Sequence, residues 1–503
     1  MLIGHAIYPG ASYVSVFEEP VIEEIVIPGN HNKNTIDFTE INSISISKFS
    51  FITITTSNLQ NTGSAGTGMR TGIQFSNDGG NTWIDAGDSY RGIGISASTA
   101  FIETQGVKGA TLLRNAGTIH NFSAVISNLN KATPTHIQSQ DMISSVPSRW
   151  DWVVQDAAIH DAIRIIVTID GGGSRVYNGG NIFLVGYRTK GSEQIIDCSV
   201  NPQTEYFIDI PAGHTIANVY MKNINLSGNT WIRVQTSVAG TPDAGGSDYR
   251  EHIMGATESS SALRADILVG MPRESGNHCH FSVWGFNTAA PMIFKAVGLR
   301  PSDGFPTDVR NFMGLRRSTT KYSQLRIFAE GNTFNSGEIF IQTYKAKTII
   351  LAEEDFGANP ANVLNITGLT KGNATAFVLC SDDLGSAVSD FQRIQVLVNG
   401  VPDAGASDYT RTEINFQNDN VFLSGSMHPT PASGTSLPTA GLFFGIPIAA
   451  PTQVTGAGLQ TGSGRWIAND RRDAAQVEDG LKVFTLSNNN WITGILYGVG
   501  YQL

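Results

Sequence analysis

The sequence predicts an all-β protein made of three tandem antiparallel β-sandwiches, each jelly-roll-like in plan. Three observations predict this class. The composition favours strands and tight turns, short strand patterns recur along the chain, and three motifs repeat in the same order at intervals of 157 to 160 residues. A chain of 503 residues is long enough for about three domains of roughly 100–200 residues each.

Low charge and abundant glycine characterise the composition. Charged residues make up 15% of the chain, against about 25% in typical soluble domains, and 54 of the 503 residues are glycine. Exposed helices carry Glu and Lys, whereas strands joined by tight turns use Ser, Thr, Asn and Gly. Hydrophobic residues reach 41%, enough to fill several cores. Many short strands separated by turn signals are typical of a sandwich, and a jelly roll is expected.

The first repeated motif is a strand followed by an Asp-rich turn that ends in tyrosine. It ends at Tyr90, Tyr249 and Tyr409, so the copies are 249 − 90 = 159 and 409 − 249 = 160 positions apart. Every copy of the turn begins Asp-Ala-Gly, as in residues 243–249.

Two further motifs repeat in step with the first. A Pro-led strand starts at Pro134, Pro291 and Pro451, at intervals of 157 and 160 positions. A closing strand begins with Gly and ends with Tyr, and its three copies, 157 positions apart, are residues 180–187, 337–344 and 494–501. Three motifs in one order at one spacing indicate three copies of a single module.

The repeats divide the chain into an N-terminal segment and three modules. The segment is residues 1–30, and the modules are residues 31–190, 191–346 and 347–503. The segment contains the acidic stretch 18–24 and shows no counterpart later in the chain. It is expected to form either an extra edge strand or an arm that docks on a neighbour, and the arm is preferred. Chained sandwiches are expected to make a stiff rod or plate.

Local patterns predict the individual elements. Residues 43–47 and 51–55 alternate polar and apolar side chains, as half-buried strands do. Each module ends with two strands joined across a turn rich in Gly, Asn or Ser. The helical candidates are single turns, starting at residues 156–158 and 473–475.

Charge excludes nucleic-acid binding. The net charge is −10, and no Lys/Arg cluster provides the basic face that phosphates require. Two arginine pairs, Arg316 with Arg317 and Arg471 with Arg472, are interpreted as solvated loop charges.

Targeting signals and cysteines bear on where the chain is made. The N-terminus lacks a signal-peptide pattern, and no apolar run reaches the roughly 18 residues of a membrane helix. Synthesis in a cytosol, with no membrane insertion, is expected. Cys198, Cys279 and Cys380 are odd in number and far apart, so reduced, structural thiols are expected.

The sequence contains no motif for catalysis. It has no Gly-x-Ser-x-Gly nucleophile elbow and no phosphate loop, and the glycines at 66–68 and 456–458 are interpreted as turn or strand glycines. The acid groups 353–355 and 382–383 are adjacent in sequence, whereas glycosidases place two carboxylates across a cleft. We therefore predict a non-enzymatic protein with no catalytic residues and no cofactor.

Two groups of residues are candidate metal ligands. His278 and His280 share one face of a strand and Cys279 lies on the other, but two ligands do not complete a site unless a metal is shared across a subunit axis. The Asp pair Asp243 and Asp248 lacks the dense oxygen ligands of a calcium loop, and an Asx turn is preferred. No metal site is predicted.

The aromatic residues divide into two groups. Phe183, Phe340 and Trp284 lie on apparent core strands and are expected to pack in the core. Contact with a ligand or another subunit is more strongly expected for residues near loops: Trp83, Trp150 and Trp231.

Two patterns resemble a known class of proteins. Residues 75–83, which read Phe-Ser-Asn-Asp-Gly-Gly-Asn-Thr-Trp and continue to Asp85, and the closing pattern of residues 180–187 resemble the jelly-roll modules of tailed-bacteriophage tail, fibre and head-decoration proteins. The later copies at 236–240 and 397–400 lack the full Asp-Gly-Gly.

The resemblance implies a non-enzymatic structural component of the phage particle, located in the virion. Its partners would be itself, as a homo-oligomer with a trimer favoured, and other virion proteins. Faces rich in Ser, Thr and Asn can pack on identical neighbours without burying unpaired ions. The alternatives are a host-receptor or carbohydrate-binding adhesin that binds a surface glycan, and a polysaccharide-degrading tailspike.

Overall fold

The structure is a computed structural model, and it confirms the all-β, antiparallel class. Apart from one 3-10 turn at Ile46–Lys48, the regular elements that it describes are strands. The described residues are 18–62, 69–85, 89–96, 99–103, 109–114, 119–141, 148–169, 175–228, 230–255, 259–270, 277–302, 305–316, 320–370, 374–386, 392–405, 408–414, 420–424, 439–446, 448–459, 465–472 and 476–503.

The chain forms one large sheet three times over, with the same strand order each time. The first is β1 (Val21–Ile27), β15 (Tyr177–Tyr187), β5 (Phe51–Asn61), β11 (Phe122–Ser127), β12 (Thr135–Asp141), β13 (Ser148–Val154), β7 (Tyr90–Ser96) and β8 (Thr99–Glu103), with β10 (Ile119–His120) beside β5. The second is β16 (Gly191–Asp197), β28 (Phe334–Lys345), β18 (His214–Leu226), β24 (Asn277–Trp284), β25 (Met292–Ser302), β26 (Phe305–Arg316), β21 (Tyr249–Gly255) and β22 (Ser259–Arg264). The third is β29 (Lys347–Asp355), β40 (Trp491–Gln502), β31 (Ala376–Ser386), β36 (Thr439–Phe444), β37 (Thr452–Leu459), β38 (Arg465–Arg472), β34 (Tyr409–Ile414) and β35 (Asn420–Ser424).

A smaller sheet covers each large one. The first is β2 (Thr35–Phe38), β14 (Ala162–Ile169), β6 (Met69–Ser76) and β9 (Ala110–Arg114), and a short ribbon of β3 (Glu40–Ile41) and β4 (Ile44–Ser45) lies nearby. The second is β17 (Glu205–Asp209), β27 (Gln324–Ala329), β19 (Ile232–Val238) and β20 (Thr241–Pro242), with β23 (Ile267–Gly270) beside β19. The third is β30 (Val363–Thr367), β39 (Gly480–Thr485), β32 (Gln392–Val398) and β33 (Val401–Pro402). We call the pairs of sheets sandwich 1 (β1–β15), sandwich 2 (β16–β28) and sandwich 3 (β29–β40).

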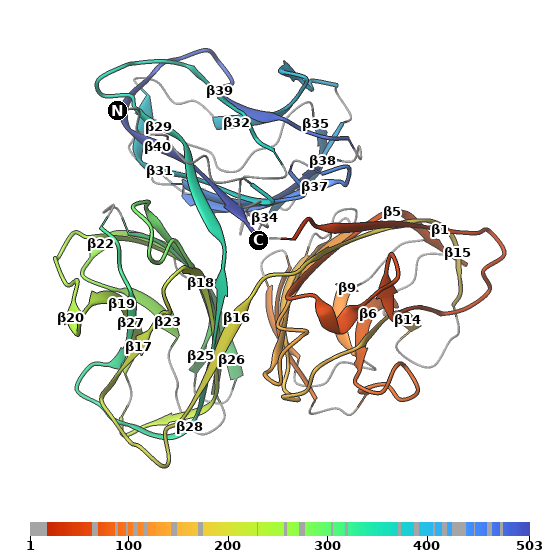
Figure 1. Cartoon of the computed structure of the whole chain (residues 1–503), viewed down its shortest axis with the longest axis horizontal. Helices are drawn as coiled ribbons and strands as arrows, with labels where there is room; N and C mark the ends of the chain where they lie inside the picture. The colour runs from red at the N-terminus through yellow and green to blue at the C-terminus, as the bar shows by residue number, and fades with distance from the viewer. Residues whose placement is uncertain are drawn as a thin grey trace, which may run out of the picture.

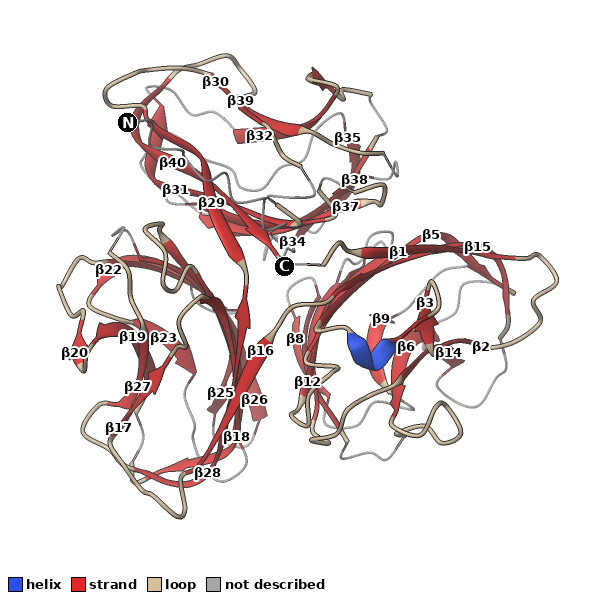
Figure 2. Cartoon of the chain, in the orientation of Figure 1, coloured by secondary structure: helices blue, strands red, loops and turns tan. Residues whose placement is uncertain are grey.

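The three sandwiches surround a common centre, so of the two expected shapes, a rod or a plate, the rod is wrong. Figures 1 and 2 show that the large sheets face that centre and the small sheets lie outside: β5, β18, β25, β31 and β37 are labelled in Figure 1, and β12 in Figure 2. The C-terminus lies at the centre, where Leu503 is fully buried. Each sandwich also has its own buried apolar cluster between its two sheets.

The repeated tyrosine of the first motif ties each large sheet to a loop and to the small sheet. Its ring is buried, and its hydroxyl accepts a hydrogen bond from a strand N–H and donates one to a loop carbonyl. The contacts are Phe75 N to Tyr90 (3.1 Å) and Tyr90 to Ile84 O (2.8 Å), Thr236 N to Tyr249 (2.8 Å) and Tyr249 to Asp243 O (3.2 Å), and Val396 N to Tyr409 (3.0 Å) and Tyr409 to Asp403 O (2.9 Å). The motif repeats because every copy of the fold uses this bond.

The Asp-Gly-Gly pattern in sandwich 1 forms a turn held by its own side chains. The Asp78 carboxylate accepts hydrogen bonds from the Thr82 hydroxyl (2.6 Å), the Thr82 N–H (2.9 Å) and the Ser76 hydroxyl (2.7 Å). These bonds lower the pKa of Asp78 to about 2. The turn therefore has a structural explanation that needs no ligand.

The glycine that opens each closing strand is required by the backbone. Gly180, Gly337 and Gly494 have φ values of +105°, +103° and +90°, which L side chains rarely adopt. A Cβ on Gly337 would lie 2.6 Å from the Asn223 carbonyl oxygen. The strand pairing shifts register beside this residue, so glycine permits a bulge there.

We therefore expect the Gly337→Ala substitution to destabilise the protein by about 1–3 kcal/mol, because both φ and the contact with backbone are unfavourable. Gly246→Ala is the matched control, since its φ is not positive and a Cβ there meets nothing within 4 Å. Thermal unfolding of both variants tests this. Equal melting temperatures for the two would contradict the explanation.

The acidic N-terminal stretch forms an edge strand, so the preference for a docking arm is wrong for residues 21–27. β1 pairs antiparallel with β15 over its whole length. The expectation that this segment has no counterpart is also wrong, because β16 and β29 occupy the same edge of their sheets. The charges stay outside the core: Glu23 accepts from the Asn42 N–H, and Glu24 accepts from Asn181. Residues 1–17 lie outside the described residues.

The expected helical turn at residues 156–158 is also absent, and the chain there is an irregular connection. The two alanines favour helix only weakly, and the adjoining backbone is held instead by bonds from His160 N to Leu129 O and from Asp161 N to Ser76 O. Its repeat partner at 473–475 lies outside the described residues.

Candidate functional site at the junction of the three sandwiches

An apolar cluster at the centre joins all three sandwiches. We call it the central cluster. Sandwich 1 supplies Phe51, Val185 and Tyr187. Sandwich 2 and its linker to sandwich 3 supply Ile216, Trp284, Ala290, Ile293, Leu315, Tyr344 and Ala346. Sandwich 3 supplies Ala376, Val378, Cys380, Phe444, Ile448, Ala450, Tyr497, Val499, Tyr501 and Leu503.

The tyrosines that end the closing motif form a cycle of contacts in this cluster. Tyr187 of sandwich 1 packs against Phe444 of sandwich 3, with ring centroids 6.1 Å apart. Tyr501 of sandwich 3 packs against Trp284 of sandwich 2 at 5.1 Å, and Tyr344 of sandwich 2 packs against Phe51 of sandwich 1 at 4.6 Å. Burial raises the pKa of all three tyrosines, so they remain neutral.

Such a cycle is a head-to-tail interface that closes after three units, as in a cyclic trimer of separate subunits. Here one chain supplies all three units. The signal in the sequence was the repeat itself, but repetition alone does not say which neighbour each tyrosine contacts.

Polar side chains, all but one of those named here uncharged, surround the central cluster and connect the large sheets. Lys295 donates to Gln138 at 2.6 Å, and Asn218 donates to Ser127 at 3.4 Å. Further contacts between sandwiches or their linkers are Gln342 to Thr133, Tyr344 to Asn128, Thr189 to the Lys345 carbonyl, and Gln453 to Thr55. The polar faces thus pack against sister sandwiches within the chain, where their hydrogen bonds offset the cost of desolvation.

The strand pairing identifies equivalent positions at the three contacts. One set lies two residues after the repeated proline: His136, Ile293 and Gln453. The other set lies on the strand that pairs with the first set. Each of its residues comes four positions before the direct pairing partner of a first-set residue, and the three are Ser123, His280 and Ala440. His136 of sandwich 1 meets His280 of sandwich 2, and Gln453 of sandwich 3 lines a cavity with Ser123 of sandwich 1. The same structural position therefore carries different chemistry at different contacts.

The contact between sandwiches 1 and 2 brings together three metal-capable side chains. His136 Nε2 lies 2.5 Å from Asp151 Oδ1, and the His280 ring stacks on the His136 ring with centroids 3.2 Å apart and planes 22° apart. The ligand atoms of the three residues all lie within 4.8 Å of one another. All three are buried, at 5% exposure for His136, 7% for Asp151 and 6% for His280.

The surroundings disfavour protonation of His280. Burial, followed by the neighbouring His136, lowers its pKa well below the usual value, and Lys295 adds to this, against a raising effect of Asp151. Neither ring nitrogen of His280 has a hydrogen-bond partner among the described residues. A neutral imidazole with free lone pairs is the form of histidine that binds metals.

Sequence reasoning found His280 but missed His136 and Asp151. It placed His278 on the same strand face as His280 without predicting a site; the side chain of His278 lies outside the described residues. Cys279 points away, into the core of sandwich 2, where burial raises the pKa of its thiol. The sequence did contain a signal for His136. The other two copies of the Pro-led motif have Ile293 and Gln453 at that position, so the histidine is a departure from the repeat.

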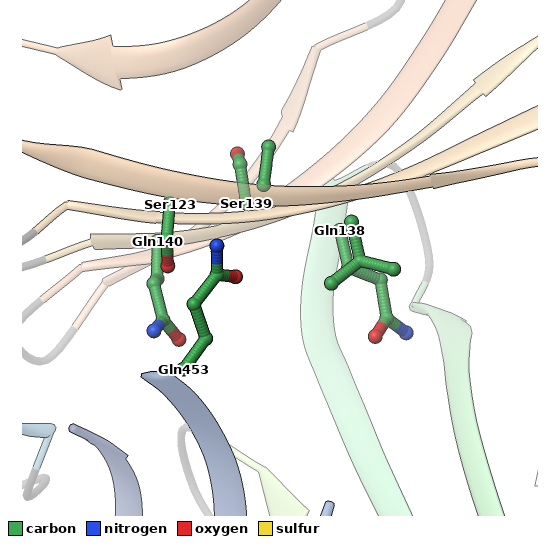
Figure 3. A pocket seen from close by; sticks show the side chains of 7 residues that line it. Ser123, Gln138, Ser139, Gln140 and Gln453 are labelled. Atoms are coloured by element: carbon green, nitrogen blue, oxygen red, sulfur yellow. The ribbon is translucent and has the colours of Figure 1, made fainter. Parts of the chain in front are cut away.

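The contact between sandwiches 3 and 1 contains a small polar cavity of about 10 Å³. Figure 3 shows Gln453 extending from β37 toward the strands of sandwich 1 that carry Ser123 and Gln140. A cavity of this size with several polar groups can hold one water molecule. It is a packing detail of the interface and too small for an organic ligand.

The repeated Asp pair binds an arginine in sandwich 2. The Asp243 carboxylate forms an ion pair with Arg316 and accepts a hydrogen bond from the Tyr322 hydroxyl at 2.6 Å, and Asp248 lies 3.9 Å from the same guanidinium. Burial opposes ionisation of Asp243, but the bonds from Tyr322 and Arg316 prevail and lower its pKa. The Arg316 guanidinium therefore supplies the positive charge beside this Asp pair.

Sandwich 3 also pairs the repeated aspartate with an arginine, but a glutamate takes the place of the tyrosine. Arg472 lies 2.5 Å from Asp403 and 3.2 Å from Glu478, and the latter carboxylate is fully buried. The interpretation of Arg316 and Arg472 as solvated loop charges is wrong, because they are only 6% and 1% exposed. Sequence adjacency suggested loop pairs, whereas the acidic partners of Arg472 include Asp403, 69 residues earlier.

Sandwich 1 lacks the arginine and has Val154 and His160 at the equivalent positions. Here 160 − 154 = 6, the same spacing as from Arg316 to Tyr322 and from Arg472 to Glu478. His160 is fully buried against Phe75, and burial lowers its pKa to about 4.

This predicts a pH dependence of stability. Between pH 4 and the ordinary value of 6.5 the unfolded chain binds a proton at this histidine and the folded chain does not, so stability falls as the pH falls through this window, by up to about 3 kcal/mol. Replacing His160 by Phe should remove that contribution. Urea unfolding of both proteins at pH 8 and pH 5 tests it, and the variant should gain relative to the wild type only at pH 5. An unchanged difference between the two pH values would contradict the assignment.

The aromatic expectations are met in part. Phe183, Phe340 and Trp284 are buried, but Trp284 packs in the central cluster and Phe340 clusters with Val153 of sandwich 1, so neither of these two fills the core of its own sandwich. Trp150 is fully buried in the core of sandwich 1, so the expectation of a loop position is wrong for it. Trp83 and Trp231 are half-buried, and the Arg164 guanidinium covers the Trp83 ring at 4.1 Å. Every described tyrosine is buried.

The acidic groups do not assemble an active site within the described part of the chain. Glu353 and Asp355 are exposed on the edge strand β29, and the side chains of Asp382 and Asp383 lie outside the described residues. Of the glycine runs, residues 66–68 lie outside them too, and residues 456–458 are in β37. The three cysteines are free and buried. No described helix is long and apolar enough to span a bilayer.

Comparison with known proteins gives no family. No protein-family model and no curated protein matches the chain. Among solved structures, the LG1-3 region of the laminin alpha2 chain is 9% identical, with 93% of this chain and 97% of that chain covered and a TM-score of 0.14. A bifunctional GH43-CE protein of Bacteroides eggerthii is 9% identical, with 98% and 63% covered and a TM-score of 0.17. At these scores neither likeness establishes a shared fold.

Proposed function

We propose that the chain is a non-enzymatic structural component of a tailed-bacteriophage particle, in the tail, fibre, collar or head decoration. It would be made in the host cytoplasm and act in the virion by self-assembly and by docking to other virion proteins. The observation that carries the proposal is the cyclic packing of three like sandwiches around one buried cluster. The plan that repeats in the three sandwiches serves contacts between them, as expected of a structural building block.

The edge strands of the sheets are candidates for docking. The edge strands of the large sheets are β1, β16 and β29 on one side and β8, β22 and β35 on the other. An unpaired edge exposes backbone N–H and C=O groups that another strand can satisfy. Self-association of chains, with a trimer favoured, or binding to other virion proteins would cover these edges.

The test is to locate the chain in purified particles. Phage particles from a producing culture are banded on a density gradient, and the chain is quantified by mass spectrometry against the major capsid protein. A fixed copy number per particle that survives a second gradient supports the proposal. A chain found only in the soluble lysate would overturn it.

The alternative is an adhesin that binds a host-surface glycan. Sugar sites present exposed aromatic rings, and in the described residues every Tyr is buried and the tryptophans are at most half-exposed. A glycan array with the purified protein separates the two. Saturable, competable binding to one glycan, with no incorporation into particles, would favour the adhesin.

A further inference from the structure

We propose that His136, Asp151 and His280 form a binding site for a divalent transition metal of the zinc class, which joins sandwich 1 to sandwich 2. The site is independent of the proposed virion role. From the sequence we predict no metal site, and we consider a metal at His280 only if two subunits share it. In the proposed site the other ligands come from another sandwich of the same chain.

The first argument is the donor set. Two imidazole nitrogens and one carboxylate oxygen lie within 4.8 Å of one another, and all three residues are at least nine-tenths buried. Imidazole with carboxylate suits zinc and its neighbours, whereas calcium and magnesium require oxygen ligands. Three protein ligands leave a fourth position for water, as in open zinc sites.

The second argument is the condition of His280. Its two ring nitrogens are buried and have no hydrogen-bond partner among the described residues. A buried polar group without a hydrogen-bond partner is unfavourable, because nothing offsets its desolvation. A metal ion would satisfy one of these nitrogens.

The third argument comes from the equivalent positions. At the contact between sandwiches 3 and 1, Gln453 and Ser123 stand in place of the histidines, and Gln453 bonds to Thr55. Close packing of these sheets therefore does not require two imidazoles. The histidine pair, with a carboxylate beside it, is a departure from the repeat at one contact.

Metal binding requires a small rearrangement. The planes of the stacked His136 and His280 rings are 22° apart. The nitrogen lone pairs of the two rings lie in those planes, so they do not converge on one point. Rotation of the His280 ring about its Cβ–Cγ bond turns its nitrogen toward His136 and Asp151. Asp151 then acts either as the third ligand or as the acceptor that orients His136. The positive charge of Lys295, which donates to Gln138, opposes the ion and will weaken the affinity.

The experiment uses the full chain, treated with chelator and then titrated with Zn²⁺. Bound metal is measured by mass spectrometry of the digested protein and by calorimetry, and Co²⁺ serves as a spectroscopic probe of coordination. We expect one Zn²⁺ per chain and a higher melting temperature with Zn²⁺. The variant His280→Asn should lose at least about tenfold in affinity and lose the melting shift.

Two controls keep the result interpretable. Gln453→Ala changes the equivalent position at another contact and should bind Zn²⁺ like the wild type. Circular dichroism of His280→Asn should retain the wild-type strand spectrum, and His136→Asn provides an independent variant should it not. Failure of the wild-type chain to retain Zn²⁺ at micromolar concentration would overturn the proposal. So would Zn²⁺ binding that is unchanged in both histidine variants, since the metal would then sit elsewhere.

Discussion

Replacing Trp284 with alanine is expected to lower the free energy of unfolding by about 3–5 kcal/mol and to loosen the packing of the sandwiches on each other. Trp284 is 4% exposed, and its ring packs against Tyr501 at 5.1 Å and against Phe444 at 6.2 Å, both in sandwich 3. Truncation leaves a cavity at a contact between sandwiches. Chemical denaturation measures the loss, taken from the first unfolding transition.

Hydrogen exchange distinguishes a loosened junction from a damaged sandwich. In the Trp284→Ala variant, exchange should rise on strands that face the centre in both sandwiches 2 and 3. Trp491→Ala is the matched control: Trp491 is 1% exposed in the core of sandwich 3, against Phe356, so faster exchange should stay within that sandwich. A loss below about 1 kcal/mol for Trp284→Ala would show that the central cluster does not stabilise the fold.

Replacing Arg472 with valine is the second change with a large expected effect, about 3–5 kcal/mol of destabilisation. The guanidinium is 1% exposed and pairs with Asp403 and with the fully buried Glu478. Without it, Asp403 loses its ion-pair partner and the buried Glu478 carboxyl loses a hydrogen-bond donor. Urea unfolding at pH 7 measures the loss.

A second substitution and the pH dependence test the reason for that loss. Burial raises the pKa of the Glu478 carboxyl to about 8 even beside Arg472, and removing Arg472 should raise it further. A carboxyl whose pKa in the folded protein is about 8 is mostly protonated there at pH 7. The additional loss from Arg472→Val should therefore grow only as the pH rises above about 8, where Glu478 ionises beside Arg472 but stays protonated in the variant. Adding Glu478→His recreates the Val154 and His160 pair of sandwich 1 and should recover at least half of the loss at pH 7. A double variant no more stable than the single one would contradict this explanation.

The repeat could be predicted because each copy of the fold reuses the same local bonds. The tyrosines at 90, 249 and 409 are fixed by contacts within 6 to 15 residues, and the glycines at 180, 337 and 494 are fixed by positive φ. Such requirements leave a visible mark in every copy. Short-range chemistry therefore carried the prediction of fold class.

The junction could not be predicted, because its contacts join residues very far apart in the chain. Gln453 meets Thr55, 398 residues away, and no local pattern marks either residue as an interface position. The polar faces were correctly described as able to pack on like neighbours, but the sequence does not say that those neighbours are in the same chain. For the same reason His136, in the Pro-led motif, was not connected with His280.

The central claim is that one chain closes three sandwiches around a common centre, and small-angle X-ray scattering tests it most directly. The measurement is made on the species of single-chain mass, 53.9 kDa, as it elutes from a size-exclusion column. A compact chain of 503 residues has a radius of gyration of about 23 Å, whereas three such sandwiches in a row would give roughly 35 Å. A value near 23 Å is the predicted result, and a value near 35 Å, with the scattering of an elongated particle, would contradict the account.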